Sequence, residues 1–396
     1  MRGVITPANE TELAAVVAGA TRDKTPLAVV GGGTRSGLGR PVQAAATLST
    51  AALTGVTLYE PTELVISARA GTPLKQVEAL LADNRQRLAF EPMDHRGIYG
   101  APKLEPTVGG VAAANVSGPR RILAGAARDS LIGVRAVTGA GVAVKSGGRV
   151  MKNVTGYDLV KALAGSHGTL GVLSEVTFKV QPVPETEATL AITGLSDNQA
   201  VAAMSAALGS PFSVTGAAHS PADESEPART YLRLDGFAAS VTYRAAQLRA
   251  LLSDFGPADI LESRTSASLW LTILDIDGLS APLSTPIWRV SVKPSDGPAI
   301  AATARAAFTA RILYDWGGGL LWIAGGEGDD AGAEVIRAAV RAVGGHATLV
   351  RAPDTVRNAV EVFQPLPAPV MDVTRKLKAV FDPAGILNPG RMYAGI

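Results

Sequence analysis

The spacing of apolar side chains predicts helices and strands in alternation at the start of the chain. Apolar residues recur at helical spacing over residues 7–20, where Thr11 is a candidate N-cap. Residues 26–30 form a short apolar run that is typical of a buried strand. Residues 64–70 alternate apolar with small or polar side chains, which predicts another strand, and Gly-Thr-Pro at 71–73 then opens an amphipathic helix.

Short elements continue up to residue 180. Residues 107–118 carry almost no bulky side chains. Two apolar runs flank a Gly-containing turn within residues 131–145, which predicts a hairpin. Residues 157–164 fit a short helix, and residues 170–180 fit a further strand.

A change of pattern after Pro182 and Pro184 marks a domain boundary. We therefore expect an α+β protein with a first domain at 1–182, a smaller α+β domain with an antiparallel sheet at 183–370, and a segment at 371–396 that returns to the first domain. The elements expected in the second domain are strands at 188–192, 230–234 and 320–324 and helices at 240–254 and 331–343. The Pro-rich stretch 362–370 fits either a linker or an exposed docking segment.

Composition limits the classes of function. Of the 396 residues, 47% are apolar and 18% are charged, so a large packed core can form. Lys and Arg number 37 against 35 Asp and Glu, a balance that argues against a nucleic-acid-binding surface. The chain has no cysteine, so any iron–sulfur cluster has to sit on a partner protein. We see no signal peptide or transmembrane stretch and expect a cytoplasmic protein, either free or held at the inner face of the cell membrane by partners.

A glycine-rich loop at residues 31–37 follows the first apolar strand. Consecutive glycines let backbone N–H groups converge on one point, which suits a diphosphate, and Thr34, Arg35 and Ser36 add polar and positive groups. The Rossmann fingerprint fails because Ser36 stands where glycine or alanine is required, and no Gly-Lys-Ser/Thr of a Walker A motif follows. Taken alone, the loop fits a tight turn between strands equally well.

The small-residue segment from Thr107 to Arg121 strengthens the binding interpretation. A core helix would carry Leu or Phe at helical spacing, whereas this segment carries mainly Gly and Ala. Such residues allow a large flat ligand to pack against the backbone. The alternative is close packing of a helix against a sheet.

A third segment makes the pattern specific. It contains Gly-Tyr-Asp-Leu at 156–159 and Gly-Ser-His-Gly-Thr-Leu-Gly-Val at 165–172, and the tail contains Asp-Pro-Ala-Gly-Ile-Leu-Asn-Pro-Gly-Arg at 382–391. Together with the two glycine segments, this order resembles the FAD-linked oxidase family with the vanillyl-alcohol-oxidase (PCMH-type) fold. The resemblance covers about residues 5–180 and 375–393 and implies a two-part FAD-binding domain followed by an α+β cap domain.

The resemblance also implies which residues contact FAD. The first loop would wrap the diphosphate, the second segment would line the flavin and its ribityl chain, and the turn and strand near 168–172 would meet the adenine end. The implied residues are Gly31, Gly32, Gly33, Thr34, Arg35, Ser36, Gly37, Thr107, Gly109, Gly110, Ala113, Ser117, Gly118, Gly168, Gly171 and Val172. Some family members bond the flavin to a loop His or a Cys; the loop lacks His and the chain lacks Cys, so non-covalent FAD is expected.

Within the family, the stretches 117–129 and 148–158 resemble the FAD-binding E-type subunits of three-part bacterial glycolate oxidases. This implies two partners, a catalytic FAD-containing sister subunit and an iron–sulfur subunit, and oxidation of glycolate to glyoxylate by the complex. Hydroxy-acid dehydrogenases of the family use a His-rich metal site, but His95, His167, His219 and His346 show no ligand spacing here. We therefore expect no metal site.

Two other functions stay open at this stage. The chain could be a stand-alone FAD-dependent 2-hydroxyacid dehydrogenase of the D-lactate type, or a flavin-free assembly scaffold. A stand-alone enzyme needs its own base, and no catalytic residue is assigned. Its substrate-domain candidates, which fit core positions equally well, are Tyr231, Arg233, Arg289, Tyr314 and Trp316.

Overall fold

The computed structural model describes residues 3–148 and 157–396. The described residues form two compact units. Unit 1 lies within Met1–Ser117, Gly125–Val183 and Pro365–Ile396, and unit 2 comprises Gly118–Ala124 and Pro184–Gln364. Residues 149–156 lie outside the described residues; they include most of the stretch 148–158 and Gly156 of the Gly-Tyr-Asp-Leu motif.

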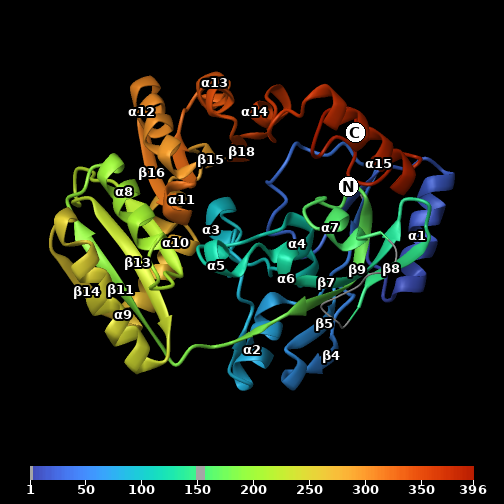
Figure 1. Cartoon of the computed structure of the whole chain (residues 1–396). Helices are drawn as coiled ribbons and strands as arrows, with labels where there is room; N and C mark the ends of the chain where they lie inside the picture. Colours follow the sequence, from blue (N-terminus) through green and yellow to red (C-terminus); the bar gives the residue numbers. More distant parts are fainter. Residues whose placement is uncertain (1–2, 149–156) are drawn as a thin grey trace. The chain divides into compact units, whose positions relative to one another are not determined.

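Unit 1 contains two main sheets, one parallel and one antiparallel, and the strands of the antiparallel sheet are labelled in Figure 1. A parallel sheet has the order β1 (Val4–Ile5), β3 (Ala46–Ser49), β2 (Leu27–Val30). An antiparallel sheet has the order β4 (Val56–Glu60), β5 (Val65–Arg69), β9 (Gly171–Lys179), β7 (Leu131–Thr138), β8 (Ala143–Gly147). A short pair joins β6 (Gln86–Arg87) to β10 (Gln181–Pro182).

One apolar core connects the two sheets of unit 1 with the end of the chain. Leu13 and Val17 of α1 pack with Leu27 of β2 and with Val172 of β9, and Leu387 of the C-terminal segment joins the same cluster. The helices of unit 1 are α1 (Glu10–Arg22), α2 (Leu74–Asp83), α3 (Arg96–Tyr99), α4 (Val108–Ala114), α6 (Ala127–Ser130), α7 (Leu159–Leu163) and α15 (Ala368–Phe381).

Unit 2 is built on one eight-stranded antiparallel sheet. Its order is β14 (Ala258–Glu262), β11 (Thr186–Thr193), β13 (Arg229–Gly236), β12 (Gly216–Ser220), β16 (Ala310–Asp315), β17 (Leu320–Gly325), β15 (Ile287–Ser291), β18 (His346–Arg351). The helices are α5 (Arg121–Ala124), α8 (Asp197–Leu208), α9 (Ala238–Leu251), α10 (Ser263–Leu274), α11 (Asp277–Ser280), α12 (Gly297–Ala307), α13 (Ala333–Val343) and α14 (Asp354–Ala359).

Two apolar clusters cover this sheet. Helices α8 and α9 pack on the half that holds β11 and β13, and α12 and α13 pack on the half that holds β15 and β17. A smaller cluster places Trp270 of α10 against β12. Mixed helices and strands around a large antiparallel sheet confirm the predicted α+β class. No helix of the described residues is long and apolar enough to cross a membrane.

The predicted N-cap of the first helix, Thr11, was wrong. Helix α1 begins at Glu10 and its N-cap is Asn9, whose side chain accepts a hydrogen bond from the Glu12 backbone N–H at 2.9 Å. Glu12 in turn accepts a hydrogen bond from the Ala8 backbone N–H at 2.9 Å, which closes the turn before the helix. The Thr11 side chain is therefore not the cap.

A buried polar network joins both halves of unit 2. Asp197, at the start of α8, accepts hydrogen bonds from the Tyr314 hydroxyl at 2.6 Å and from Arg305 at 2.7 Å, and its carboxylate lies 3.5 Å from His219 Nε2. Burial opposes ionisation of Asp197, but these three partners outweigh it and hold the pKa of the carboxyl well below its usual value. The His219 ring is fully buried and its other nitrogen contacts the Thr230 hydroxyl at 3.0 Å.

We expect Asp197→Ala to destabilise unit 2 by about 2–4 kcal/mol at pH 7, because it leaves buried donors without their acceptor. Since the folded pKa of Asp197 is lowered, the carboxylate stabilises the fold above its unfolded pKa, and this contribution is lost as pH falls. Urea unfolding at pH 7 and pH 3 should therefore show a smaller gap between wild type and variant at pH 3. The control, Asp372→Ala, removes the exposed pair with Arg375 and should cost under about 0.5 kcal/mol. An equal effect of both variants at pH 7 would contradict this account.

Candidate functional site

The glycine loop between β2 and β3 lies directly against the segment that precedes α4. A Cβ on Gly31 would overlap the Thr107 hydroxyl, and a Cβ on Gly32 would overlap the backbone oxygen of Glu105. Side chains are therefore excluded at both positions.

Helix α4 begins at the other side of this contact. Thr107 is its N-cap and accepts a hydrogen bond from the Gly110 backbone N–H at 3.2 Å. A Cβ on Gly109 would lie 2.6 Å from the Ala70 Cβ, so Gly109 lets α4 pack closely on the end of β5. A Cβ on Gly110 would meet only Thr107 Oγ1 at 3.2 Å and Arg35 Nη1 at 3.5 Å. The small residues thus serve close backbone packing at Gly109, whereas Gly110 contacts only side chains.

These segments line an open cavity in unit 1. Its walls come from β2 and the glycine loop, from α4, from the turn before β9, and from the C-terminal segment. The lining residues are Val29, Val30, Gly31, Gly32, Gly33, Thr34, Arg35, Ser36, Thr50, Ala70, Thr107, Gly109, Gly110, Ala113, Ala114, His167, Gly168, Gly171, Val172, Leu173 and Arg391.

The charges around the cavity favour an anion. Arg35 is buried, and its Nη2 donates to the backbone oxygen of Met93 at 3.2 Å. Its buried Nε has no hydrogen-bond partner among the described residues. Burial lowers the pKa of Arg35 to about 10, partly offset by Asp94, so the guanidinium stays charged at neutral pH.

His167 adds no further positive charge to the cavity at neutral pH. Burial, together with the positive charges of Arg391 and Arg35, lowers the pKa of His167 to about 3. The imidazole is therefore neutral at physiological pH. No Asp or Glu lines the cavity among the residues that the structure describes, and an anionic ligand would be paired there with guanidinium groups.

Comparison with known proteins shows which family this chain belongs to. Residues 1–147 match the FAD binding domain family, and residues 367–392 match the C-terminal domain of FAD linked oxidases. The chain is 36% identical over 375 residues to glycolate oxidase subunit GlcE of Escherichia coli K12, which covers 95% of both chains. The chain belongs to the FAD-linked oxidases.

Other relatives match over shorter stretches. A D-lactate dehydrogenase of Archaeoglobus fulgidus is 34% identical over 190 residues, which is 48% of this chain and 41% of that protein. Among solved structures, the 4-ethylphenol oxidase of Gulosibacter chungangensis aligns with a TM-score of 0.75 over 99% of this chain and 90% of its own, at 14% identity. An alkyldihydroxyacetonephosphate synthase aligns with a TM-score of 0.69 over 98% of this chain and 76% of its own, at 17% identity. These two likenesses confirm the PCMH-type fold.

FAD is the cofactor of this family, and the residues present fit it. A loop with no side chains at Gly31 and Gly32 exposes backbone N–H groups, which is how diphosphates are cradled. The buried Arg35 has an Nε donor that no described residue uses. A dinucleotide diphosphate supplies acceptors and negative charge for both features.

Most of the FAD-contact residues expected from the sequence lie together at the cavity. They are Gly31, Gly32, Gly33, Thr34, Arg35, Ser36, Thr107, Gly109, Gly110, Ala113, Gly168, Gly171 and Val172.

Three expected residues lie elsewhere. Gly37 packs against the Tyr99 ring, where its Cβ would lie 2.5 Å from Cδ1. The Ser117 hydroxyl accepts a hydrogen bond from the Ala127 backbone N–H at 2.9 Å. Gly118 belongs to unit 2, where its carbonyl accepts a hydrogen bond from Trp316 Nε1 at 3.1 Å.

Sequence reasoning missed several lining residues, above all Arg391. Arg391 ends the tail motif that carried part of the resemblance, so the motif was noticed but its position in the fold was not. His167 was seen within the turn motif, yet its ring was not assigned to the cavity. Thr50 and Leu173 also line the cavity and carried no sequence signal.

The substrate-domain candidates of unit 2 each have a structural partner. Tyr314 donates to Asp197, Arg233 lies over the Trp270 ring at 4.4 Å, and Arg289 lies over the Trp316 ring at 4.9 Å. Tyr231 is partly buried and packs beside the cluster around Trp270. No group of three or more metal-ligating side chains gathers anywhere in residues 3–148 and 157–396.

We expect Gly110→Leu to lower the flavin content of the purified protein while the fold is kept. The α4 position accepts a Cβ without a backbone clash, so the longer side chain fills cavity space instead of unfolding the helix. Flavin absorbance per mole of protein, with circular dichroism for the fold, measures the effect. The control is Gly97→Leu on α3, where the position is exposed and a Cβ meets nothing within 4 Å. Full flavin content in Gly110→Leu would remove Gly110 from the site.

Proposed function

We propose that this protein is the FAD-binding subunit of a glycolate oxidase complex that oxidises glycolate to glyoxylate. The observation that carries the proposal is the match of 36% identity to a glycolate oxidase subunit over 95% of both chains. A match of this extent includes unit 2 as well as the cofactor domain. It therefore supports a shared role of the whole chain and not of the FAD-binding domain alone.

The cavity of unit 1 is the proposed FAD site, and non-covalent binding is proposed because the glycine loop has no His and the chain has no Cys. The glycine loop and Arg35 would hold the diphosphate, and α4 from Thr107 to Ala113 would line the cofactor. Bound FAD supplies a two-electron acceptor that can also release electrons singly. The chain's own residues bind and orient it, and the neutral His167 takes no proton from solvent near pH 7.

Partners complete the proposed complex. A protein named glycolate oxidase subunit GlcD, from Bacillus subtilis, is 42% identical over 84 residues, or 21% of this chain. We propose a GlcD-like catalytic subunit as one partner. An iron–sulfur subunit as the second partner would accept electrons, since this chain has no cysteine for a cluster. The complex would work in the cytoplasm or at the inner face of the cell membrane.

A stand-alone 2-hydroxyacid dehydrogenase is the second candidate. The D-lactate dehydrogenase of Archaeoglobus fulgidus favours it, although its match covers 48% of this chain. Such an enzyme needs a base close to the hydroxyl proton of its substrate. In unit 2, the buried His219 contacts Asp197 and Thr230 instead, which does not support the stand-alone enzyme.

The predicted domains, 1–182, 183–370 and 371–396, are proposed as folding units. Unit 2 draws a short segment, Gly118–Ala124, out of the first domain, and Arg120 of this segment forms a buried ion pair with Asp235. Limited proteolysis should leave a large fragment that begins near residue 183. Cleavage spread evenly through residues 183–364 would contradict the proposal.

The decisive activity test compares the lone chain with the assembled complex. We expect the purified chain to reduce a dye acceptor with glycolate at most weakly, and co-expression with a GlcD-like and an iron–sulfur subunit to raise turnover at least a hundredfold. A glycolate rate of the lone chain equal to that of the complex would favour the stand-alone enzyme. No glycolate oxidation by either preparation would reject the proposed substrate.

A further inference from the structure

Arg391 belongs to the C-terminal segment, yet it lines the cavity beside the glycine loop. Its Nη2 donates a hydrogen bond to the backbone oxygen of Arg35 at 3.0 Å. Two arginine side chains from opposite ends of the chain therefore share one cavity. No carboxylate stands among the described lining residues.

His167 lines the same cavity as Arg35 and Arg391. Burial is the largest cause of its low pKa, and the guanidinium groups of Arg391 and Arg35 are the next two. Because Arg35 and Arg391 both line the cavity and no carboxylate does so among the described residues, the cavity suits a ligand with two negative charges close together, such as a diphosphate.

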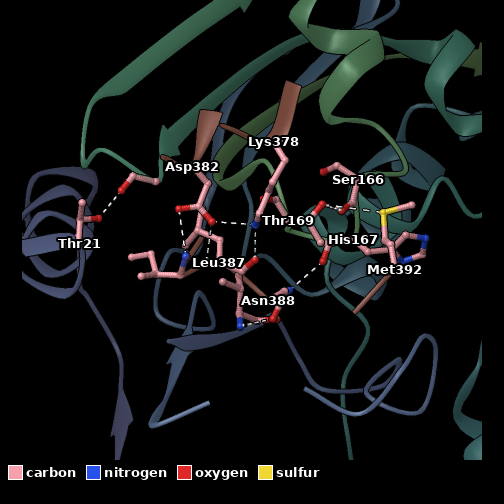
Figure 2. A network of polar contacts seen from close by, with 12 residues as sticks. Thr21, Ser166, His167, Thr169, Lys378, Asp382, Leu387, Asn388 and Met392 are labelled. Atoms are coloured by element: carbon pink, nitrogen blue, oxygen red, sulfur yellow. Dashed lines mark hydrogen bonds and ion pairs between the residues drawn. The ribbon is translucent and has the colours of Figure 1, made fainter. Parts of the chain in front are cut away.

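A buried network fixes the segment that carries Arg391 (Figure 2). Lys378 of α15 donates to the carboxylate of Asp382 at 2.7 Å and to the backbone oxygens of Thr169 and Leu387, each at 2.8 Å. Burial lowers the pKa of Lys378, and the ion pair with Asp382 opposes this. All three donors of the ammonium group are used.

The same network continues from Asp382 and Asn388. The Asp382 carboxylate accepts from the backbone N–H groups of Ile386 at 3.1 Å and Leu387 at 2.8 Å, which shapes the turn before Asn388. Asn388 accepts from the Val29 backbone N–H at 2.8 Å and donates to the His167 backbone oxygen at 2.8 Å.

Asn388 therefore joins two walls of the cavity, the end of β2 and the turn before β9, to the segment that ends in Arg391. Figure 2 shows these segments converging on the Lys378 and Asn388 side chains. Residues separated by more than two hundred positions are brought together by side chains that do not themselves line the cavity.

We propose that Arg391 is the second cation of the diphosphate site, opposite Arg35, and that the Lys378–Asp382–Asn388 network positions it there. The proposal rests on the proposed binding of FAD. It makes Arg391 a ligand-contacting residue and the network a set of positioning residues. The C-terminal segment is then part of the cofactor site, and its docking and FAD binding favour each other.

The first test measures the affinity of apoprotein for FAD by titration calorimetry. Arg391→Met should weaken FAD binding about tenfold to a hundredfold, the range expected when a charged hydrogen-bond donor is lost. Arg391→Lys keeps the charge and should restore part of the affinity. Arg22→Met, which removes an exposed arginine of unit 1, should leave the affinity unchanged.

A stability measurement separates binding from a merely structural role. Arg391→Met removes one hydrogen bond, to the Arg35 backbone oxygen, so the unfolding temperature of the apoprotein should fall only slightly while the FAD affinity falls clearly. The FAD affinity of the variant should also depend less on salt concentration. An apoprotein that melts lower, with FAD affinity and salt dependence as in wild type, would overturn the proposal.

The second test concerns the network. Asn388 has a positive φ of 45°, so Asn388→Gly removes the side-chain hydrogen bonds while the backbone is kept. If Asn388 acts through Arg391, the double variant Asn388→Gly/Arg391→Met should lose less FAD affinity than the product of the fold-losses of the two single variants. A full product would overturn the positioning role. Wild-type protein that binds no FAD would instead overturn the proposed function, which distinguishes the two failures.

Discussion

The architecture of the site depends on one close contact, the approach of the glycine loop to the chain just before α4. Gly32 lies where any side chain would overlap the backbone oxygen of Glu105, and Gly31 lies against the Thr107 side chain. The contact brings β2 and α4 within reach of one ligand although nearly eighty residues separate them in the sequence. Gly109 acts in the same way, because its lack of a side chain lets α4 pack closely on the end of β5.

The remaining wall comes from the end of the chain. Ile386 and Leu387 enter the same apolar core as Leu13 and Val172, and the buried Lys378–Asp382 pair satisfies the backbone around them. Apolar burial supplies affinity for this docking, while the ion pair and Asn388 set its register. Arg35 and Arg391 both line the cavity that this docking completes.

Much of this could be predicted from the sequence, because the relevant signals were local. The apolar run of β2, the three glycines after it and the small residues of α4 each constrain their own backbone, and the structure places them together at the cavity. The eight-stranded order of unit 2 carried no such signal, since strand neighbours are chosen by long-range packing.

Arg391 and Gly118 are two residues whose position in the fold could not be predicted from the sequence. Arg391 reaches the cavity although 356 positions separate it from Arg35, and Gly118 joins unit 2, in which Arg120 pairs with Asp235. Neither event is encoded in the neighbouring residues. The N-cap of α1 was also mispredicted, because Asn9 and not the nearby Thr11 caps the helix.

The most direct test of the account is an absorbance spectrum of the purified chain, taken before and after acid precipitation. The account predicts a two-banded flavin spectrum and yellow flavin released into the supernatant, as expected for FAD held without a covalent bond. A protein that is colourless, and stays so after incubation with FAD, would contradict the account. The glycine segments would then serve packing alone, as in a scaffold that keeps the fold without the cofactor.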